Sequence, residues 1–264
     1  MTVQSILWAA GGTGFTFLMT TLGAALVFFF KNKISADVQR IFLGFAAGVM
    51  IAASVWSLLI PAIDQAEGSG MPGWLPAAGG FLLGILFLMA MDALLPHLAP
   101  ESFHWREGQT SRRRTLMLVL AVTLHNIPEG MAVGVSFALA AQAEDPALLT
   151  AAVALALGIG VQNFPEGAAI ALPLRQEGMS RRRAFALGAL SGVVEPVFGL
   201  LTVLAVGSVQ ALMPWLLSFA AGAMLYVVVE ELIPEANLSQ GGHTGTLGVM
   251  TGFLMMMILD VALG

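Results

Sequence analysis

The sequence has no cysteine and few charged residues. Without a thiol, a disulfide-stabilised fold and any thiolate metal or redox site are excluded. Charged residues make up 10% of the 264 residues, whereas they make up about a quarter of a soluble domain. The formal net charge is −5, which gives no indication of a nucleic-acid partner. An ordinary soluble domain is therefore excluded.

Apolar residues dominate instead, at 58% of the chain with a mean hydropathy of +0.87. They form continuous runs of the length that a transmembrane helix needs, about 20 residues, and not the alternating pattern of a barrel strand. We predict an all-α, multi-pass protein of the plasma (inner) membrane, with residues 1–264 forming one polytopic domain. The eight predicted spans are residues 4–30, 38–63, 74–96, 114–141, 146–174, 183–210, 212–234 and 246–263.

The basic residues indicate the orientation of these spans. All 11 Lys and Arg residues lie between spans one and two, three and four, or five and six. The alternate connections carry acids only, such as Asp64 and Glu67. Because basic loops face the cytoplasm, both termini are predicted to be extracytoplasmic.

Two motifs occur twice in the chain. His-Asn-Ile-Pro-Glu-Gly at 125–130 in span four returns as Gln-Asn-Phe-Pro-Glu-Gly at 162–167 in span five. Phe-Ala-Ala-Gly-Val-Met at 45–50 returns as Phe-Ala-Ala-Gly-Ala-Met at 219–224, and each is followed by Leu-Ile-Pro. In each pair, the two copies cross the membrane in opposite directions. This pattern indicates inverted-topology repeats, which many secondary transporters have, with the substrate site near the midplane.

The Pro-Glu-Gly copies place carboxylates deep in the membrane. His125 and Glu129 are four residues apart and share one helical face, and Glu166 and Glu195 are predicted at a similar depth. A lone ionised carboxylate there costs about 2.5–3.5 kcal/mol on insertion scales. No Lys or Arg lies in a span core. Either a bound cation or shared protons must compensate, and imidazole with oxygen donors suits a divalent ion such as Zn²⁺, Fe²⁺ or Mn²⁺.

These residues resemble the Zrt/Irt-like (ZIP) metal transporters, in particular the prokaryotic GufA-type branch. The resemblance covers nearly the whole chain. It implies that spans one, four, five and six carry the ion, and that the other spans form a scaffold whose Phe-Ala-Ala-Gly faces permit sliding. It implies a one- or two-metal site made by His125, Asn126, Glu129, Gln162, Asn163, Glu166 and Glu195, approached by Met50. It also implies an outer entrance at Ser57 and Asp64 and an inner exit along Asp92, His97, Glu230 and Glu231.

The predicted function is the transport of Zn²⁺, or of Cd²⁺, Fe²⁺ or Mn²⁺, into the cytoplasm by alternating access. The metal is substrate, and no organic cofactor is expected. Lipid and metal ions are the expected partners, and the glycine-rich faces permit a homodimer. Two alternatives stay open: a proton-coupled carrier of another solute, and an intramembrane metalloenzyme. The enzyme is disfavoured because His-Glu-x-x-His and Gly-x-Ser-x-Gly motifs are absent.

Overall fold

The computed structural model describes residues 3–29, 35–98, 110–143, 145–176, 178–208, 210–237 and 242–263. These residues form helices joined by short turns, and no strand occurs among them, which confirms the predicted all-α class. The α-helices are α1 (Val3–Ala25), α2 (Ala36–Ala53), α3 (Ile60–Gly68), α4 (Trp74–Leu98), α5 (Thr110–Ala143), α6 (Pro146–Gln176), α7 (Arg181–Ser191), α8 (Val194–Ser208), α9 (Met213–Val227), α10 (Ile233–Asn237) and α11 (Thr244–Leu263).

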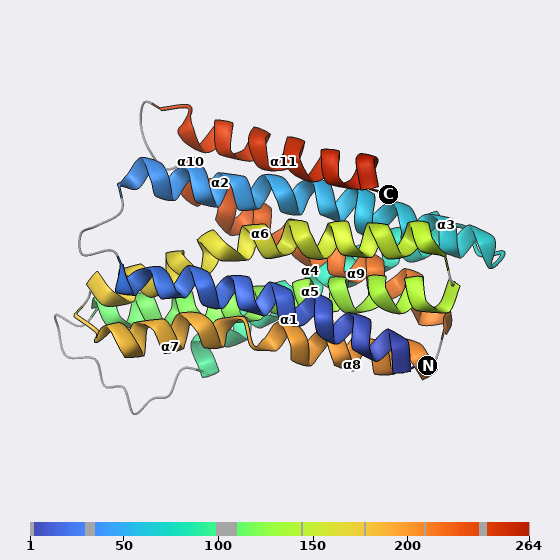
Figure 1. Ribbon diagram of the computed structural model, residues 1–264, viewed down its shortest axis with the longest axis horizontal. Helices are drawn as coiled ribbons and strands as arrows, with labels where there is room; N and C mark the ends of the chain where they lie inside the picture. The colour runs from blue at the N-terminus through green and yellow to red at the C-terminus, as the bar shows by residue number, and fades with distance from the viewer. Residues whose placement is uncertain are drawn as a thin grey trace.

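Membrane-spanning helices account for nearly all of this structure. Seven described segments are long and apolar enough to cross a bilayer, and α5, with 34 residues, is a further helix of sufficient length. The helices run alongside one another in alternating directions, and both chain ends lie at the same end of the bundle (Figure 1). The chain is therefore a multi-pass membrane protein.

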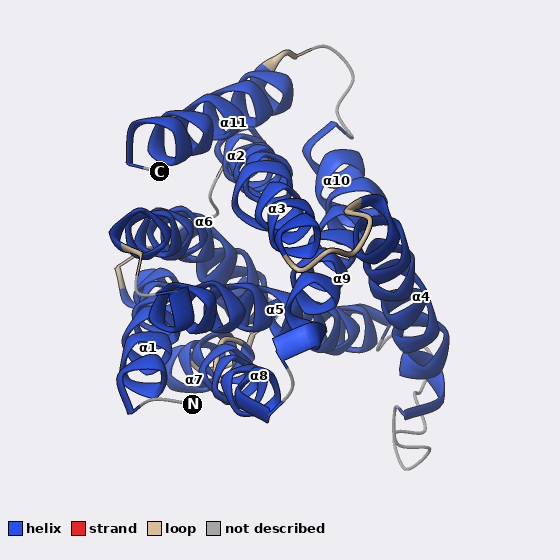
Figure 2. Ribbon diagram, turned by 90° about the vertical axis from the view of Figure 1, so that its right-hand side faces the viewer, coloured by secondary structure: helices blue, strands red, loops and turns tan. Residues whose placement is uncertain are grey.

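The helices pack as two groups (Figure 2). We call α1, α5, α6, α7 and α8 the site bundle, because they carry the Pro-Glu-Gly copies and pack against one another. The flanking bundle comprises α2, α3, α4, α9, α10 and α11, in which α2 packs on α11 and α4 on α9. The two groups meet where α5 contacts α9 and where α6 contacts α2 and α11. This is the same division of the spans that the family resemblance implies.

The glycines of the Phe-Ala-Ala-Gly copies join helices inside the flanking bundle. A side chain at Gly48 would meet the backbone of Val249 and Phe253 on α11, and one at Gly222 would meet the backbone of Phe81 on α4. Helices approach this closely only where a small residue such as glycine, which has no Cβ atom, lies at the contact. The glycines of the two copies thus serve packing within the flanking bundle, and sliding along the Phe-Ala-Ala-Gly faces stays a prediction.

The helical geometry changes at places that the sequence analysis did not identify. Two segments are π-helical: Ser54–Leu59, between α2 and α3, and Val228–Leu232, between α9 and α10. Each of them ends at the repeated Leu-Ile-Pro. The sixth span is divided between α7 and α8 by a turn at Gly192 and Val193. By contrast, α5 and α6 continue through the prolines of the Pro-Glu-Gly copies. π-helical turns are frequent at functional sites. The paired segments therefore indicate that α2 and α9 have a functional role besides facing lipid.

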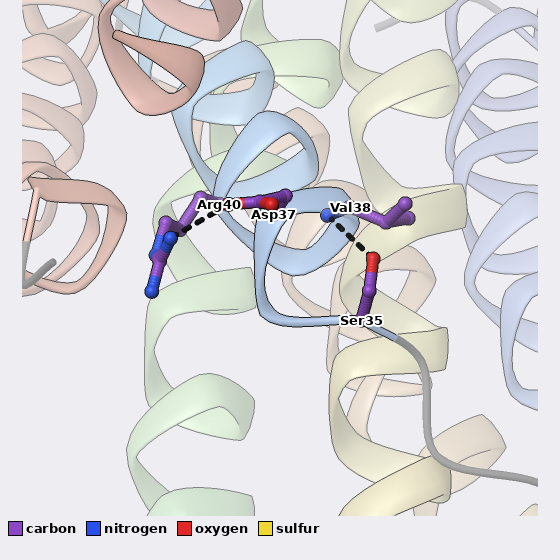
Figure 3. A network of polar contacts seen from close by, with 4 residues as sticks. All are labelled: Ser35, Asp37, Val38 and Arg40. Carbon is purple, nitrogen blue, oxygen red and sulfur yellow. Dashed lines mark hydrogen bonds and ion pairs between the residues drawn. The ribbon is translucent and has the colours of Figure 1, made fainter. Parts of the chain in front are cut away.

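The start of α2 shows how a span is fixed at its polar end (Figure 3). The Ser35 hydroxyl accepts a hydrogen bond from the Val38 backbone N–H at 3.4 Å, and Arg40 pairs with Asp37 at 2.7 Å. A serine in this position satisfies one of the free N–H groups of the first turn. Ser180 accepts the same bond from Arg183 at the start of α7, at the same end of the bundle.

Candidate metal transport site

The candidate site lies where α5 and α6 pack side by side, between α1 and α8. Each Pro-Glu-Gly glycine brings a neighbouring helix to the site. A Cβ atom at Gly130 of α5 would overlap the backbone of Glu195 on α8, and one at Gly167 of α6 would overlap the backbone carbonyl of Thr20 on α1. Both motif glycines are therefore required for close helix crossings, and the two crossings place Glu195 and Thr20 beside the same pair of helices.

Glu129 pairs with the second copy of the motif. Gln162 donates a hydrogen bond from Nε2 to Oε1 of Glu129 at 2.6 Å, and both side chains are fully or almost fully buried. Conversely, Asn126 of the first copy is placed against the carboxylate of Glu166, which is half-buried. Asn126 also donates to the backbone carbonyl of Ser191 at 3.1 Å. Each copy of the motif thus presents an amide to the carboxylate of the other.

Glu195 is held by two other helices. Its Oε2 atom accepts a hydrogen bond from Asn163 Nδ2 at 2.9 Å, and its Oε1 atom accepts one from the Thr20 hydroxyl at 3.3 Å. The side chain has no exposed surface and stands in the first turn of α8, where the helix dipole favours an anion. Both carboxylate oxygens of Glu195 therefore have protein partners.

Four buried oxygen atoms at the site have no hydrogen-bond partner. Eight such polar atoms occur among the described residues, and half of them are Asn126 Oδ1, Glu129 Oε2, Gln162 Oε1 and Asn163 Oδ1. Buried oxygens are nearly always hydrogen-bonded, so this concentration needs a cause. All four belong to residues of the predicted ligand set, so they are available as oxygen donors to a cation.

The carboxylates interact electrostatically without forming one compact cluster. The charges of Glu166 and Glu195 act on Glu129, and those of Glu195 and Glu231 act on Glu166. Yet no three Asp, Glu, His or Cys side chains of the described residues gather closely enough to hold a metal ion. The amide groups of Gln162 and Asn163 lie against Glu129 and Glu195 instead. A metal site built from the described side chains must include amide oxygens.

Some predicted residues fall outside what the structure describes. The side chains of His125, Asp92 and His97 are not among the described ones, although all three residues lie within helices. Met50 is buried in the apolar core that α2 shares with α5 and α9. Glu230 is exposed and Glu231 is half-buried, both on the second π-helical segment.

The predicted outer entrance is partly occupied by a buried pair. Ser57 donates a hydrogen bond to Asp260 of α11 at 2.6 Å, and both residues are buried. Asp64, two turns further along, is exposed. Asp260 lies near the end of α11, so this hydrogen bond joins the second and eighth spans.

Sequence reasoning also missed Thr20. Thr13, Thr16 and Thr20 are fully buried and repeat at three- and four-residue intervals on one face of α1. That spacing on an otherwise apolar helix is a helical-face signal readable from the sequence. A polar stripe directed into the bundle would have indicated that α1 reaches the site.

These features define a class: a multi-pass helical membrane protein with an oxygen-rich site buried between two proline-containing helices. Comparison with known proteins narrows that class. Residues 104–260 match the family described as ZIP Zinc transporter. The zinc transporter GufA of Myxococcus xanthus is 44% identical over 93% of this chain and 94% of its own, and zinc transporter ZIP11 of Homo sapiens is 39% identical over 99% and 98%. Zinc transporter ZIPB of Bordetella bronchiseptica is 38% identical over 97% of this chain and 82% of its own.

The chain belongs to the ZIP zinc transporter family. The predicted resemblance, including the GufA-type branch, is confirmed by these matches over nearly the full length. The chain is accordingly a transporter and not an enzyme, so the metalloenzyme alternative is set aside.

Proposed function

We propose that this protein carries Zn²⁺, and related divalent ions, into the cytoplasm through the site between α5 and α6. The observation that carries the proposal is the group of unpartnered oxygens of Asn126, Glu129, Gln162 and Asn163. Together with the named function of the relatives, these oxygens identify the substrate as a cation. Their position, buried between two helices that each contain a Pro-Glu-Gly copy, is typical of a transport site at a repeat interface.

The donors suit a borderline divalent ion. Glu129 and Glu166 supply negative charge, the amides supply neutral oxygens, and His125 stands one turn before Glu129 to supply a nitrogen. Met50 approaches from α2 as a further, weaker donor. A set with few full charges binds the ion without holding it too tightly for release, which transport requires.

The proposed cycle is alternating access. The protein has eight spans in inverted repeats and lies in the plasma membrane. Its basic connections face the cytoplasm, and both termini are therefore extracytoplasmic. The ion enters past Ser57 and Asp64 and leaves along Glu231, Glu230, Asp92 and His97. Glu231 supports this route, because its charge acts on Glu166 at the site. The site bundle carries the ion past the flanking bundle.

The test is metal uptake into liposomes containing the purified protein. Replacing the acids in the variant Glu129→Ala/Glu166→Ala should reduce Zn²⁺ uptake to the level of empty liposomes. The control variant Asp37→Ala/Glu67→Ala also removes two acids, both exposed, and should transport as the unaltered protein does. Zn²⁺ uptake that survives loss of Glu129 and Glu166 would refute the proposed site.

A further inference from the structure

The site includes a helix that neither the repeated motif nor the ligand set contains. α1 passes beside α6, and Gly167 is the point of contact: a Cβ there would overlap the Thr20 carbonyl oxygen and approach the Ala24 nitrogen to 2.9 Å. In the other copy, Gly130 makes the equivalent contact with the backbone of Glu195. Thr20 therefore occupies, beside the second copy, the place that Glu195 occupies beside the first.

The two equivalent residues are bonded to each other. The Thr20 hydroxyl lies 3.3 Å from Glu195 Oε1 and 3.3 Å from the Thr16 carbonyl oxygen of its own helix, so its one proton is shared between two acceptors, and the Thr20 and Glu195 side chains are fully buried. Gly192, in the turn before α8, leaves the space for this contact: a Cβ there would lie 3.0 Å from the Thr20 Oγ1 atom and 3.1 Å from Glu195 Oε1. The absence of a side chain at Gly192 therefore makes room for the hydrogen bond between Thr20 and Glu195.

The bond continues to the candidate ligands. Glu195 accepts from Asn163 Nδ2, and the same nitrogen lies 3.5 Å from the carbonyl oxygen of Thr16. With its nitrogen fixed in this way, Asn163 has its Oδ1 atom left without a partner. The orientation of Asn163 thus depends on where Glu195 is held.

We propose that Thr20 is a positioning residue of the transport site: its hydroxyl holds Glu195 and, through the Glu195–Asn163 hydrogen bond, keeps the carbonyl oxygen of Asn163 free for the metal ion. The inference rests on the proposed function of this site. It makes Glu195 an anchor for a ligand in the metal-free state, since both of its oxygens are engaged. It also gives α1, through its buried threonines, a part in metal binding.

The test compares variants that keep or remove one hydroxyl group. Thr20→Val has nearly the same shape without the hydroxyl, Thr20→Ser keeps the hydroxyl, and Thr21→Val removes a neighbouring hydroxyl that bonds only to the Phe17 carbonyl of its own helix. Zn²⁺ uptake into liposomes gives KM and the maximal rate for each variant. Losing a hydrogen bond to a buried carboxylate should raise the KM of Thr20→Val about fivefold. The maximal rate should change less than the KM, and the Thr20→Ser and Thr21→Val variants should match the unaltered protein.

A double-mutant cycle separates positioning from packing. If Thr20 acts through Glu195, Thr20→Val should have little further effect on KM in a Glu195→Gln background. Additive effects, equal losses in Thr20→Val and Thr20→Ser, or an unchanged KM in Thr20→Val would each overturn the inference. If Glu195→Gln transports too little for a KM, the comparison of Ser with Val at position 20 decides alone. If the KM of Thr20→Val is unchanged while Glu129→Ala/Glu166→Ala is inactive, the role of Thr20 is refuted. The proposed transport function is then still supported.

Discussion

The close crossing of α1 and α6 can be tested by adding one methyl group. In Gly167→Ala the new Cβ atom overlaps the Thr20 carbonyl oxygen and lies 2.9 Å from the Ala24 nitrogen, whereas ordinary contact begins near 3.4 Å. Both obstructing atoms are backbone, so no rotamer change relieves them, and the helices must separate. Overpacking of this kind costs about 1–3 kcal/mol, and we take the upper end because a backbone must move. Because alanine has a higher helix propensity than glycine, the substitution also stabilises the folded state by about 1 kcal/mol. The expected net loss in free energy of unfolding is about 2 kcal/mol.

The same displacement should impair transport, because it acts on a hydrogen bond that is already long. Thr20 and Glu195 are 3.3 Å apart, beyond the usual 2.5–3.0 Å for two oxygens, so a shift of about half an ångström in α1 removes their contact. Thermal unfolding in detergent and Zn²⁺ uptake in liposomes measure the two effects. Gly11→Ala is the control, since Gly11 lies on α1, the partner helix of this crossing, is exposed and has no neighbouring atom within 4 Å of the position that a Cβ atom would take. If Gly167→Ala unfolds and transports as Gly11→Ala does, the close crossing is not present.

Three further perturbations have distinct expected results. Ser57→Ala should lower the free energy of unfolding by about 1–3 kcal/mol, because it leaves a buried oxygen of Asp260 without its donor, as thermal melting in detergent can measure. Adding Zn²⁺ at about 100 times its Kd should raise the free energy of unfolding by about 2.7 kcal/mol, and both a chelator and the variant Glu129→Gln/Glu166→Gln should abolish that gain. Arg40→Ala should change stability by less than about 1 kcal/mol in the same assay, because its ion pair is exposed.

The spans were predictable because bilayer thickness imposes a minimum length on an apolar helix. The third and fifth predicted spans begin at the same residues as α4 and α6, Trp74 and Pro146. The internal breaks were not predictable in the same way. The π-helical segment at Ser54–Leu59 and the turn at Gly192 depend on which neighbours the backbone must accommodate, and those neighbours are distant in sequence.

The site was only partly predictable for a related reason. A repeated Pro-Glu-Gly in two antiparallel spans identified α5 and α6, and the paired contacts of Glu129 with Gln162 agree with that prediction. The hydrogen-bond partners of each carboxylate were not predictable, because depth along a span gives height in the membrane and not the rotation of each side chain. Thr20 was missed since a threonine in an apolar span ordinarily bonds to its own helix, as Thr21 does with Phe17 and as Thr20 also does with Thr16.

The amides at this site explain how buried carboxylates can be stabilised without a metal ion. A carrier that works by alternating access must also return empty, and an unsolvated carboxylate in the membrane costs about 2.5–3.5 kcal/mol on insertion scales. Gln162 and Asn163 reduce that cost by donating N–H groups to Glu129 and Glu195. Their carbonyl oxygens point elsewhere and stay unpartnered. One neutral side chain can thus serve the empty carrier through its nitrogen and the loaded carrier through its oxygen, a division that an aspartate at the same position could not make.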